Sequence, residues 1–335
     1  MFNACDVAAY LEANEPLCGA LGLLGSPPVD VCLLARGEYN QNFIFTHPTT
    51  GQSLLFRVNL GSQMQLDNQI AYEANALFLL KDSGRTPHVL FVDDSKAFFG
   101  KGILVEEFLP GRPLDYTTDL TLAAQILADI HSVPVPEEHG LIEPENPLQG
   151  IVDECSAMFS RYRSWSNASP HVCARVDRWF KKAQAAAGGS TTVHKRHIIS
   201  TELNSGNFLI NEDAPSYLID WEKPLYAEVE QDLAHFLVPT TTFWKTDTIL
   251  SSSAVGSFVE HYRHAVGNRF DTSDIENRLP SYCAITCLRG ITWCAMALAQ
   301  HEGNERKVAD VYTLEKIKEY LEEPFLTLIE EHYYS

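Results

Sequence analysis

The most constraining feature of this chain is a short polar loop followed by two apolar runs. Glu202 and Asn207 stand five positions apart in a stretch rich in Asn, Ser and Gly, and the apolar run behind them ends at Ile210. A polar turn, residues 211–215, leads to a second run that ends on Asp220. Two short apolar runs joined by such a turn predict a β-hairpin. Asn207 and Asp220 should flank it.

These groups are the ones that phosphoryl transfer from a nucleotide requires. A carboxylate must orient the acceptor hydroxyl, while oxygen ligands hold Mg²⁺ against the phosphates. The loop, the hairpin and the sequence Asp-Trp-Glu that begins at Asp220 therefore predict a catalytic loop containing Glu202. They also predict a metal-binding pair, Asn207 and Asp220.

The stretch from Ser200 to Glu222 resembles the catalytic core of the aminoglycoside phosphotransferase and choline kinase-like family. The family pattern is His-Gly-Asp-x-x-x-x-Asn, a hairpin and then Ile-Asp-Trp-Glu. The resemblance implies that Asn207 and Asp220 are the metal ligands and that Glu202 replaces the catalytic Asp. Ser200 replaces the His. Glu keeps the charge of Asp but moves the carboxylate by roughly an ångström, which matters where catalysis depends on positioning.

The same resemblance implies an α+β, bilobal protein-kinase-like fold. The N-lobe, residues 1–107, would be a small antiparallel sheet with one helix, and the C-lobe, residues 108–335, would be mainly helical. ATP would be the phosphate donor, Mg²⁺ the metal, and a hydroxyl group of a small molecule the acceptor. Aminoglycosides, choline-like amino alcohols, amino acids, sugars and nucleosides all stay open as acceptors. So does the oligomeric state.

The first hundred residues agree with such a lobe, because they alternate between short strand-like runs and turns. The expected strands are 29–34, 42–46, 52–60, 88–92 and 102–108. Arg57 alternates with Phe56 and Val58 and should point away from their face of the sheet. The resemblance implies that Arg57 steadies the phosphates and pairs with Glu73 on the following helix. A solvent-exposed Arg and an ordinary helix Glu are the alternative.

Two more segments of this lobe resemble nucleotide-binding elements. The turn 37–42, Gly-Glu-Tyr-Asn-Gln-Asn, resembles the loop that covers the nucleotide, so Gly37 and Asn40 are candidate contacts. The irregular run after Phe108 resembles the hinge between lobes, where main-chain groups hold adenine. Glu107 would contribute its carbonyl and Leu109 its amide. Glu106 either faces this pocket or pairs with Arg112.

Beyond the hinge, apolar residues recur at three- and four-residue steps. The expected helices are 120–131, 161–187, 230–237, 281–300 and 314–331. The resemblance implies that Asp232 braces the catalytic loop. His131 ends the first of these helices and is interpreted as a packing residue rather than a catalytic one. Phe243 and Trp244 are either acceptor contacts or core residues.

Charge and cysteine usage narrow the class of protein. The net charge of −19, from 44 acidic and 25 basic residues, disfavours nucleic acid or an anionic membrane as a partner and suits a cationic acceptor. Eight cysteines without a Cys-x-x-Cys pair favour reduced, buried thiols over a metal or redox site. We find no signal peptide and no apolar run near the ~20 residues that span a bilayer. We expect a soluble, cytoplasmic protein.

Two rival interpretations remain. The replacements at Ser200 and Glu202 suit a catalytically impaired, pseudokinase-like module that binds a nucleotide or another ligand for regulation. The same fold could instead transfer AMP. We expect a small-molecule kinase, because the metal pair and the pair of Arg57 with Glu73 are both retained.

Overall fold

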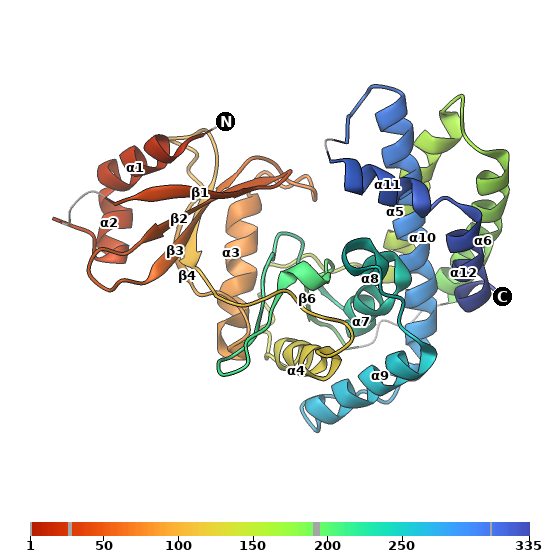
Figure 1. Cartoon of the computed structure of the whole chain (residues 1–335). Helices are drawn as coiled ribbons and strands as arrows, with labels where there is room; N and C mark the ends of the chain where they lie inside the picture. The colour runs from red at the N-terminus through yellow and green to blue at the C-terminus, as the bar shows by residue number, and fades with distance from the viewer. Residues whose placement is uncertain (1, 26–28, 190–194, 309) are drawn as a thin grey trace. The chain divides into compact units, whose positions relative to one another are not determined.

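Packing divides the protein into two compact units. The structure is a computed structural model that describes residues 2–25, 29–189, 195–308 and 310–335. Unit 1 consists of Met1–Pro113, Val133–Ile142 and Asn207–Pro224, and unit 2 consists of Leu114–Ser132, Glu143–Gly206 and Leu225–Ser335. The expected α+β class is confirmed, because unit 1 contains an antiparallel sheet and unit 2 is mainly helical (Figure 1). The lobe boundary after residue 107 stays a prediction.

Unit 1 is built on a five-stranded sheet with the order β1-β2-β3-β5-β4, in which each neighbouring pair is antiparallel. The strands are β1 (Val31–Arg36), β2 (Asn40–Thr46), β3 (Ser53–Asn59), β4 (Val89–Asp93) and β5 (Ile103–Glu107). All five expected strands are confirmed, with their ends within two residues of the predicted positions.

Different helices cover the two faces of this sheet (Figure 1). α1 (Ala4–Ala13) and α2 (Glu15–Leu21), which were not predicted, bury apolar residues against the face that carries Phe56 and Val58. α3 (Gln69–Leu80), the expected helix, lies over the other face and is followed by the short 3-10 helix η1 (Lys81–Ser83). Arg57 therefore points away from the apolar face, as predicted.

The later segment Asn207–Pro224 adds a hairpin to unit 1. The predicted hairpin is present as β7 (Phe208–Leu209) and β8 (Tyr217–Leu218), preceded by the 3-10 turn η2 (Ser205–Asn207). The Arg112 backbone pairs with Ile210 next to β7 through two hydrogen bonds of 3.1 and 2.7 Å. The chain that leaves the sheet is thus tied to the hairpin.

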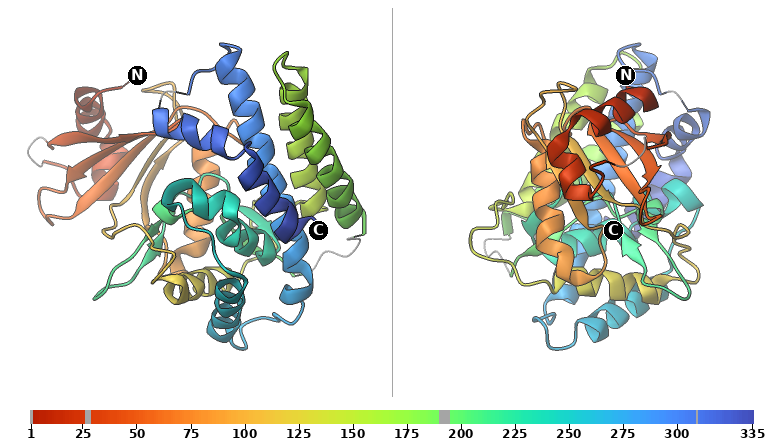
Figure 2. Two further views of the ribbon diagram at one scale, coloured as in Figure 1. Left: turned by 45° about the vertical axis from the view of Figure 1, so that its right-hand side comes forward. Right: turned by 90° about the vertical axis from the view of Figure 1, so that its left-hand side faces the viewer.

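The helices of unit 2 include one long element, α10, against which most of the others pack, whereas α4 packs against α9 (Figure 2). They are α4 (Leu120–His131), α5 (Pro147–Ser164), α6 (Pro170–Gly189), α7 (Val229–Leu237), α8 (Pro239–Thr246), α9 (Ser252–Val266), α10 (Ile275–Glu302), α11 (Val311–Glu319) and α12 (Glu323–Tyr333). A two-stranded ribbon, β6 (His197–Ile199) with β9 (Leu225–Ala227), lies among them.

Contrary to expectation, α10 is long and apolar enough to cross a membrane, with a mean hydropathy of 1.4 over its most apolar window. Within the described residues it is the one helix that meets this test, and 67% of that window is buried inside the protein. Such burial is typical of the central helix of a helical core.

Three predicted helices are wrong in extent: the helix expected at 281–300 begins already at Ile275, and two others are divided near a proline. In place of one helix over 161–187, α5 ends at Ser164 and α6 begins at Pro170. In place of one helix over 314–331, α11 ends at Glu319 and α12 starts with Pro324 in its first turn. Proline fits the first turn of a helix, where its missing amide would have no intrahelical partner. α10, by contrast, carries Pro280 in its interior.

Candidate active site

Asn207 and Asp220 flank the hairpin of unit 1 at its open end. β7 and β8 pair Phe208 with Leu218, and the Ile219 amide donates a hydrogen bond of 2.9 Å to the Asn207 carbonyl. The sequence prediction that one hairpin carries both residues is therefore confirmed. Their role as metal ligands remains a prediction.

Asp220 adopts an uncommon backbone conformation. Successive side chains of an extended strand point to opposite faces of the sheet. Asn207 lies opposite Ile219 in the hairpin register, so these two side chains share a face. If the strand continued regularly, the next side chain, that of Asp220, would point to the other face. Asp220 instead has a φ of 69°, in the left-handed region. This conformation interrupts the alternation, and Asp adopts it more readily than most residues other than glycine. Buried Trp221 anchors the turn, donating from Nε1 to the Leu218 carbonyl at 3.0 Å.

Arg57 lies on the α3 face of the sheet in a buried ionic cluster. Its guanidinium pairs with Glu73 of α3 and lies 3.6 Å from Glu106 of β5, and its Nε donates to Asn42 at 3.2 Å. The expected pair with Glu73 is present. Arg57 is only 6% exposed, which excludes the alternative of a surface arginine. Glu106 faces Arg57 because Leu55 is its cross-strand partner, which places the two charged residues on one face.

Negative charge exceeds positive charge around Arg57. Glu73, Glu106, Asp220 and Glu222 all act on it electrostatically, and together they raise its pKa despite burial. Burial raises the pKa of Glu73 and of Glu106, and the charge of Arg57 opposes that shift. One buried oxygen of each of these two glutamates has no hydrogen-bond partner within the described chain. Arg57 is thus shared among four acidic side chains, and burial favours the neutral form of two of them, Glu73 and Glu106.

The donor set of the hairpin fits Mg²⁺. Asn207 offers an amide oxygen and Asp220 a carboxylate, and Mg²⁺ is usually held by one or two such side chains together with waters and substrate phosphates. In the described ranges no group of three or more His, Cys, Asp or Glu side chains could hold a metal. A site completed by phosphates does not require such a group.

The turn between β1 and β2 is linked to Glu222 through Asn40. The buried Asn40 side chain donates to the Glu222 carboxylate at 2.7 Å and accepts from Asn59 at 3.0 Å. The Gly37 amide closes the turn on the Asn40 carbonyl at 2.8 Å. Nucleotide contacts of Gly37 and Asn40 stay predictions. The geometry adds a structural role for Asn40, because it couples the turn to the segment of Asp220.

The chain after β5 passes close behind the hairpin. A Cβ built on Gly111 would lie 2.7 Å from the Cβ of Leu209, and Gly111 has a φ of 152°, so this approach requires glycine. The Glu107 amide donates to the His88 carbonyl at 3.0 Å. This bond does not conflict with the prediction, which assigns the carbonyl of Glu107, and not its amide, to adenine. The adenine contacts of Glu107 and Leu109 remain untested.

In unit 2, Asp232 holds the start of the predicted catalytic loop. Its fully buried carboxylate accepts the backbone amides of Ser200 at 2.8 Å and Thr201 at 2.7 Å, and it lies 3.2 Å from the imidazole of His131. The expected brace is confirmed. His131 also contacts the Tyr262 hydroxyl at 2.8 Å, so the packing interpretation of this histidine fits the structure.

His235, which sequence analysis did not single out, holds the other side of the loop. Its Nδ1 lies 3.0 Å from the Leu203 amide nitrogen and 3.2 Å from the Leu203 carbonyl oxygen, so the ring bonds to the Leu203 backbone. Burial and the charge of Arg289 lower the pKa of His235 to about 4, so the ring is neutral at pH 7. Glu202 therefore lies between two anchored backbone stretches. Arg289 of α10, which is bound to Glu154 at 2.8 Å, also acts electrostatically on Glu202.

Phe243 and Trp244 are both packed by neighbours within unit 2. The Nζ of Lys316 lies 3.6 Å from the centre of the Phe243 ring, and Trp244 stacks on Tyr320 and meets Trp293 edge to face. Phe243 thus already has a cation over its ring. A role for either residue in acceptor binding stays a prediction.

The cysteines follow the prediction of reduced, mostly buried thiols. All eight are free, and five of them are buried. Burial raises the pKa of Cys155 and of Cys283 to about 12, which suppresses thiolate formation.

Sequence comparison decides the family. Residues 30–273, most of the chain, match the model of the phosphotransferase enzyme family. The chain is a member of this family. The resemblance stated from the catalytic loop is thereby confirmed. Comparison with curated proteins finds no match.

Solved structures agree on the fold. Spectinomycin phosphotransferase, solved with ADP and spectinomycin, is 13% identical with a TM-score of 0.65, and the match covers 98% of this chain and 97% of that one. Choline kinase from Streptococcus pneumoniae is 19% identical with a TM-score of 0.61, covering 94% and 98%. Ethanolamine kinase from Plasmodium vivax is 13% identical with a TM-score of 0.64, covering 96% and 89%. The fold is the bilobal protein-kinase-like fold.

Proposed function

We propose that this protein transfers the γ-phosphoryl group of ATP to a hydroxyl group of a small molecule. The observation that carries the proposal is the hairpin that brings Asn207 and the left-handed Asp220 to one end. The buried Arg57, which Asp220 and Glu222 influence electrostatically, supports a site for charged groups in the same unit. Membership of the phosphotransferase family supports the reaction class.

Each group has a role in the proposed reaction. Asn207 and Asp220 would hold Mg²⁺, which supplies charge neutralisation on the phosphates when bound. Arg57, positioned by Glu73, would steady the phosphates. Glu202 would accept the hydrogen bond of the acceptor hydroxyl and orient its oxygen toward the γ-phosphorus. The new O–P bond forms as the bond to the bridging oxygen of ADP breaks, the hydroxyl proton passes to Glu202, and no phosphorylated protein is formed.

The anchored loop favours an active enzyme over an impaired one. Asp232 and His235 hold the backbone on both sides of Glu202, and such positioning is what the chemistry needs. The longer side chain of Glu202 can place its carboxylate only if the backbone is held firmly. For the acceptor, the net charge of −19 makes cationic hydroxyl compounds the first class to test.

The test uses ATP radiolabelled at either the γ- or the α-phosphate, with a library of hydroxyl metabolites that includes amino alcohols and aminoglycosides. We expect γ-label, and no α-label, in one acceptor class. Glu202→Gln should lower turnover by at least about 100-fold while leaving ATP affinity nearly unchanged. Glu212→Gln, in the exposed hairpin turn, is the matched control. Transfer of α-label would instead indicate nucleotidyl transfer, and no transfer at all would support the regulatory module.

A further inference from the structure

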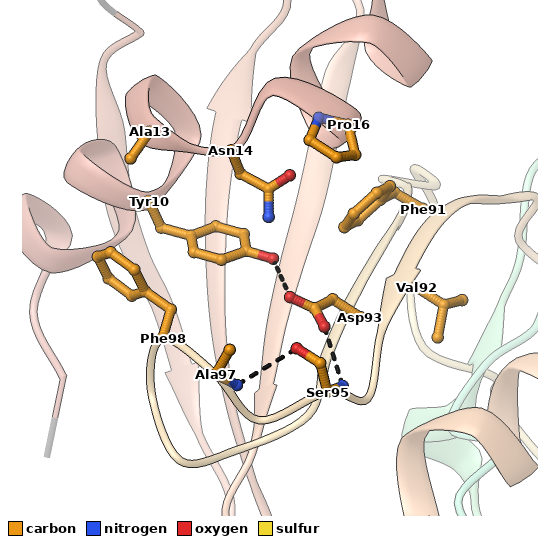
Figure 3. Close-up of a pocket in the computed structure, with 10 residues that line it drawn as sticks. All are labelled: Tyr10, Ala13, Asn14, Pro16, Phe91, Val92, Asp93, Ser95, Ala97 and Phe98. Carbon is orange, nitrogen blue, oxygen red and sulfur yellow. Dashed lines mark hydrogen bonds between the residues drawn. The ribbon is translucent and has the colours of Figure 1, made fainter.

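Unit 1 contains an open cavity that includes none of the predicted active-site residues. It lies where α1 and α2 meet β4 and the loop that follows β4, and its volume is about 550 Å³ (Figure 3). Cavities of this size accommodate ordinary metabolites. One wall comes from α1 and α2, which precede residue 30, where the family match begins. The cavity is thus partly built by sequence outside the matched segment.

A carboxylate without a counter-charge lies at the centre of this cavity. The Tyr10 hydroxyl donates to one oxygen of Asp93 at 2.6 Å, and the Ser95 amide donates to the other at 2.9 Å (Figure 3). Burial alone would raise the pKa of Asp93, but the hydrogen bonds from Ser95 and Tyr10 outweigh it and lower the pKa. Asp93 is therefore ionised at pH 7. No Lys, Arg or His within the described ranges forms an ion pair with it.

The surrounding walls are mainly apolar and aromatic. Phe91 and Phe98 stand on either side of Asp93, and Pro16 and Ala13 come from the helical wall (Figure 3). Phe98 is 51% exposed at the rim, although it also meets the Tyr10 ring edge to face at 5.1 Å between centroids. Aromatic faces attract cations as well as apolar groups. A negative charge set among aromatic rings suits a ligand that is cationic at one end and apolar at the other.

We propose that this cavity binds a small organic ammonium ion with an apolar body. The ammonium group donates to the free lone pairs of Asp93, and the body lies between Phe91 and Phe98. The Tyr10 and Ser95 hydrogen bonds hold the carboxylate in place, so little ordering of the protein accompanies binding. A purely structural Asp93, serving only to cap its own loop through Ser95, is the competing explanation.

Three probes of nearly the same shape separate these explanations by calorimetric titration: phenethylamine, phenethyl alcohol and hydrocinnamate. We expect saturable binding of the cation, at least about tenfold weaker binding of the alcohol, and no binding of the anion, because a charge-assisted hydrogen bond contributes this much. Equal binding of the alcohol and the amine would overturn the proposal. So would the absence of saturable amine binding.

Matched variants locate the site. Asp93→Asn should weaken phenethylamine binding about tenfold and leave phenethyl alcohol unaffected, whereas Asp94→Asn, which changes the adjacent carboxylate outside the cavity lining, should bind like the wild type. Phe98→Ala, at the exposed rim, should weaken amine binding without loss of folding, and thermal unfolding verifies that each variant is folded. Equal losses in both aspartate variants, or wild-type binding by Asp93→Asn, would refute the assignment. None of these titrations depends on phosphoryl transfer.

Discussion

Individual side chains hold the backbone of the predicted catalytic loop on both sides of Glu202. Asp232 accepts two backbone amides ahead of Glu202, and the His235 ring bonds to the backbone of Leu203, which follows it. Both anchors come from one turn of α7. Burial lowers the pKa of the His235 ring to about 4, so the ring is neutral at pH 7 and its protonation at lower pH would destabilise the fold.

His235→Asn tests this dependence, because the Asn side chain can replace Nδ1 as the hydrogen-bond partner of the Leu203 backbone without titrating. The pKa of His235 is about 4 in the folded state against 6.5 for an unperturbed histidine, so the unfolded chain binds the proton first as pH falls below about 6.5. The free energy of unfolding therefore decreases as the pH falls from about 6.5 toward 4. The wild type should lose on the order of 2 kcal/mol through this histidine between pH 7 and pH 5.

Urea unfolding at the two pH values measures the difference. The pH dependence of His235→Asn should be smaller by this amount, and His261→Asn, which changes an exposed histidine, should keep the wild-type dependence. A wild-type pH dependence in His235→Asn would show that the ring does not resist protonation.

Spacing along the chain was sufficient to predict some candidate site residues but not others. Asn207 and Asp220 follow from the loop and hairpin pattern, because both lie beside local turns. Glu106 and Glu222 do not follow from it. Glu106 meets Arg57 only through the register of β3 with β5, and Glu222 meets Asn40 across 182 residues of sequence. For Glu106, the one indication in the sequence was that a charged residue occurs within the mainly apolar strand β5.

At the scale of elements, the hairpin depends on the close approach of the linker after β5. Gly111→Ala should destabilise the protein by about 1–3 kcal/mol, because the added methyl group cannot fit against Leu209. It should also weaken Mg-ATP binding by displacing the hairpin that carries Asp220.

Gly150→Ala is the matched control. Gly150 lies inside α5, and an added Cβ meets no atom within 4 Å. This variant should be as stable as the wild type or gain about 0.5–1 kcal/mol. Thermal unfolding and ATP titration measure both effects. Wild-type stability and affinity in Gly111→Ala would contradict the proposed dependence.

The sequence predicted the strands better than the helix ends. The predicted helix 161–187 joined only the end of α5 to α6 and missed most of α5, whereas α11 and α12 were predicted as the single helix 314–331. α1 and α2 were missed because each is short. Their caps were visible, since Asn3 forms a capping box with Asp6 and Asn14 caps α2 ahead of a proline.

At the scale of the whole molecule, three separate stretches of chain form unit 1. Every residue predicted to bind nucleotide or metal belongs to it, and Glu202 belongs to unit 2. The family could be predicted because its pattern is local. The chemical identity of the acceptor could not be predicted, because the surroundings of a candidate acceptor contact such as Phe243 depend on residues far away in the sequence, here Lys316.

Hydrogen exchange tests whether the nucleotide binds to unit 1. Mg-ATP should slow amide exchange in β3, β5 and the β7–β8 hairpin, while α11 and α12 keep their exchange rates, since a ligand stabilises the structure to which it binds. Glu202→Gln should retain this protection, and Asp220→Ala should lose it. Protection confined to the helices of unit 2 would contradict the assignment of the nucleotide site.

The most direct test of the central claim is the binding of Mn²⁺ together with ATP, followed by electron paramagnetic resonance. The wild type should bind the ion, and Asn207→Ala and Asp220→Ala should each weaken binding at least about tenfold. Asp213→Ala, in the exposed turn of the same hairpin, should bind as the wild type does. Unchanged Mn²⁺ affinity in either of the first two variants would contradict a metal site at this hairpin.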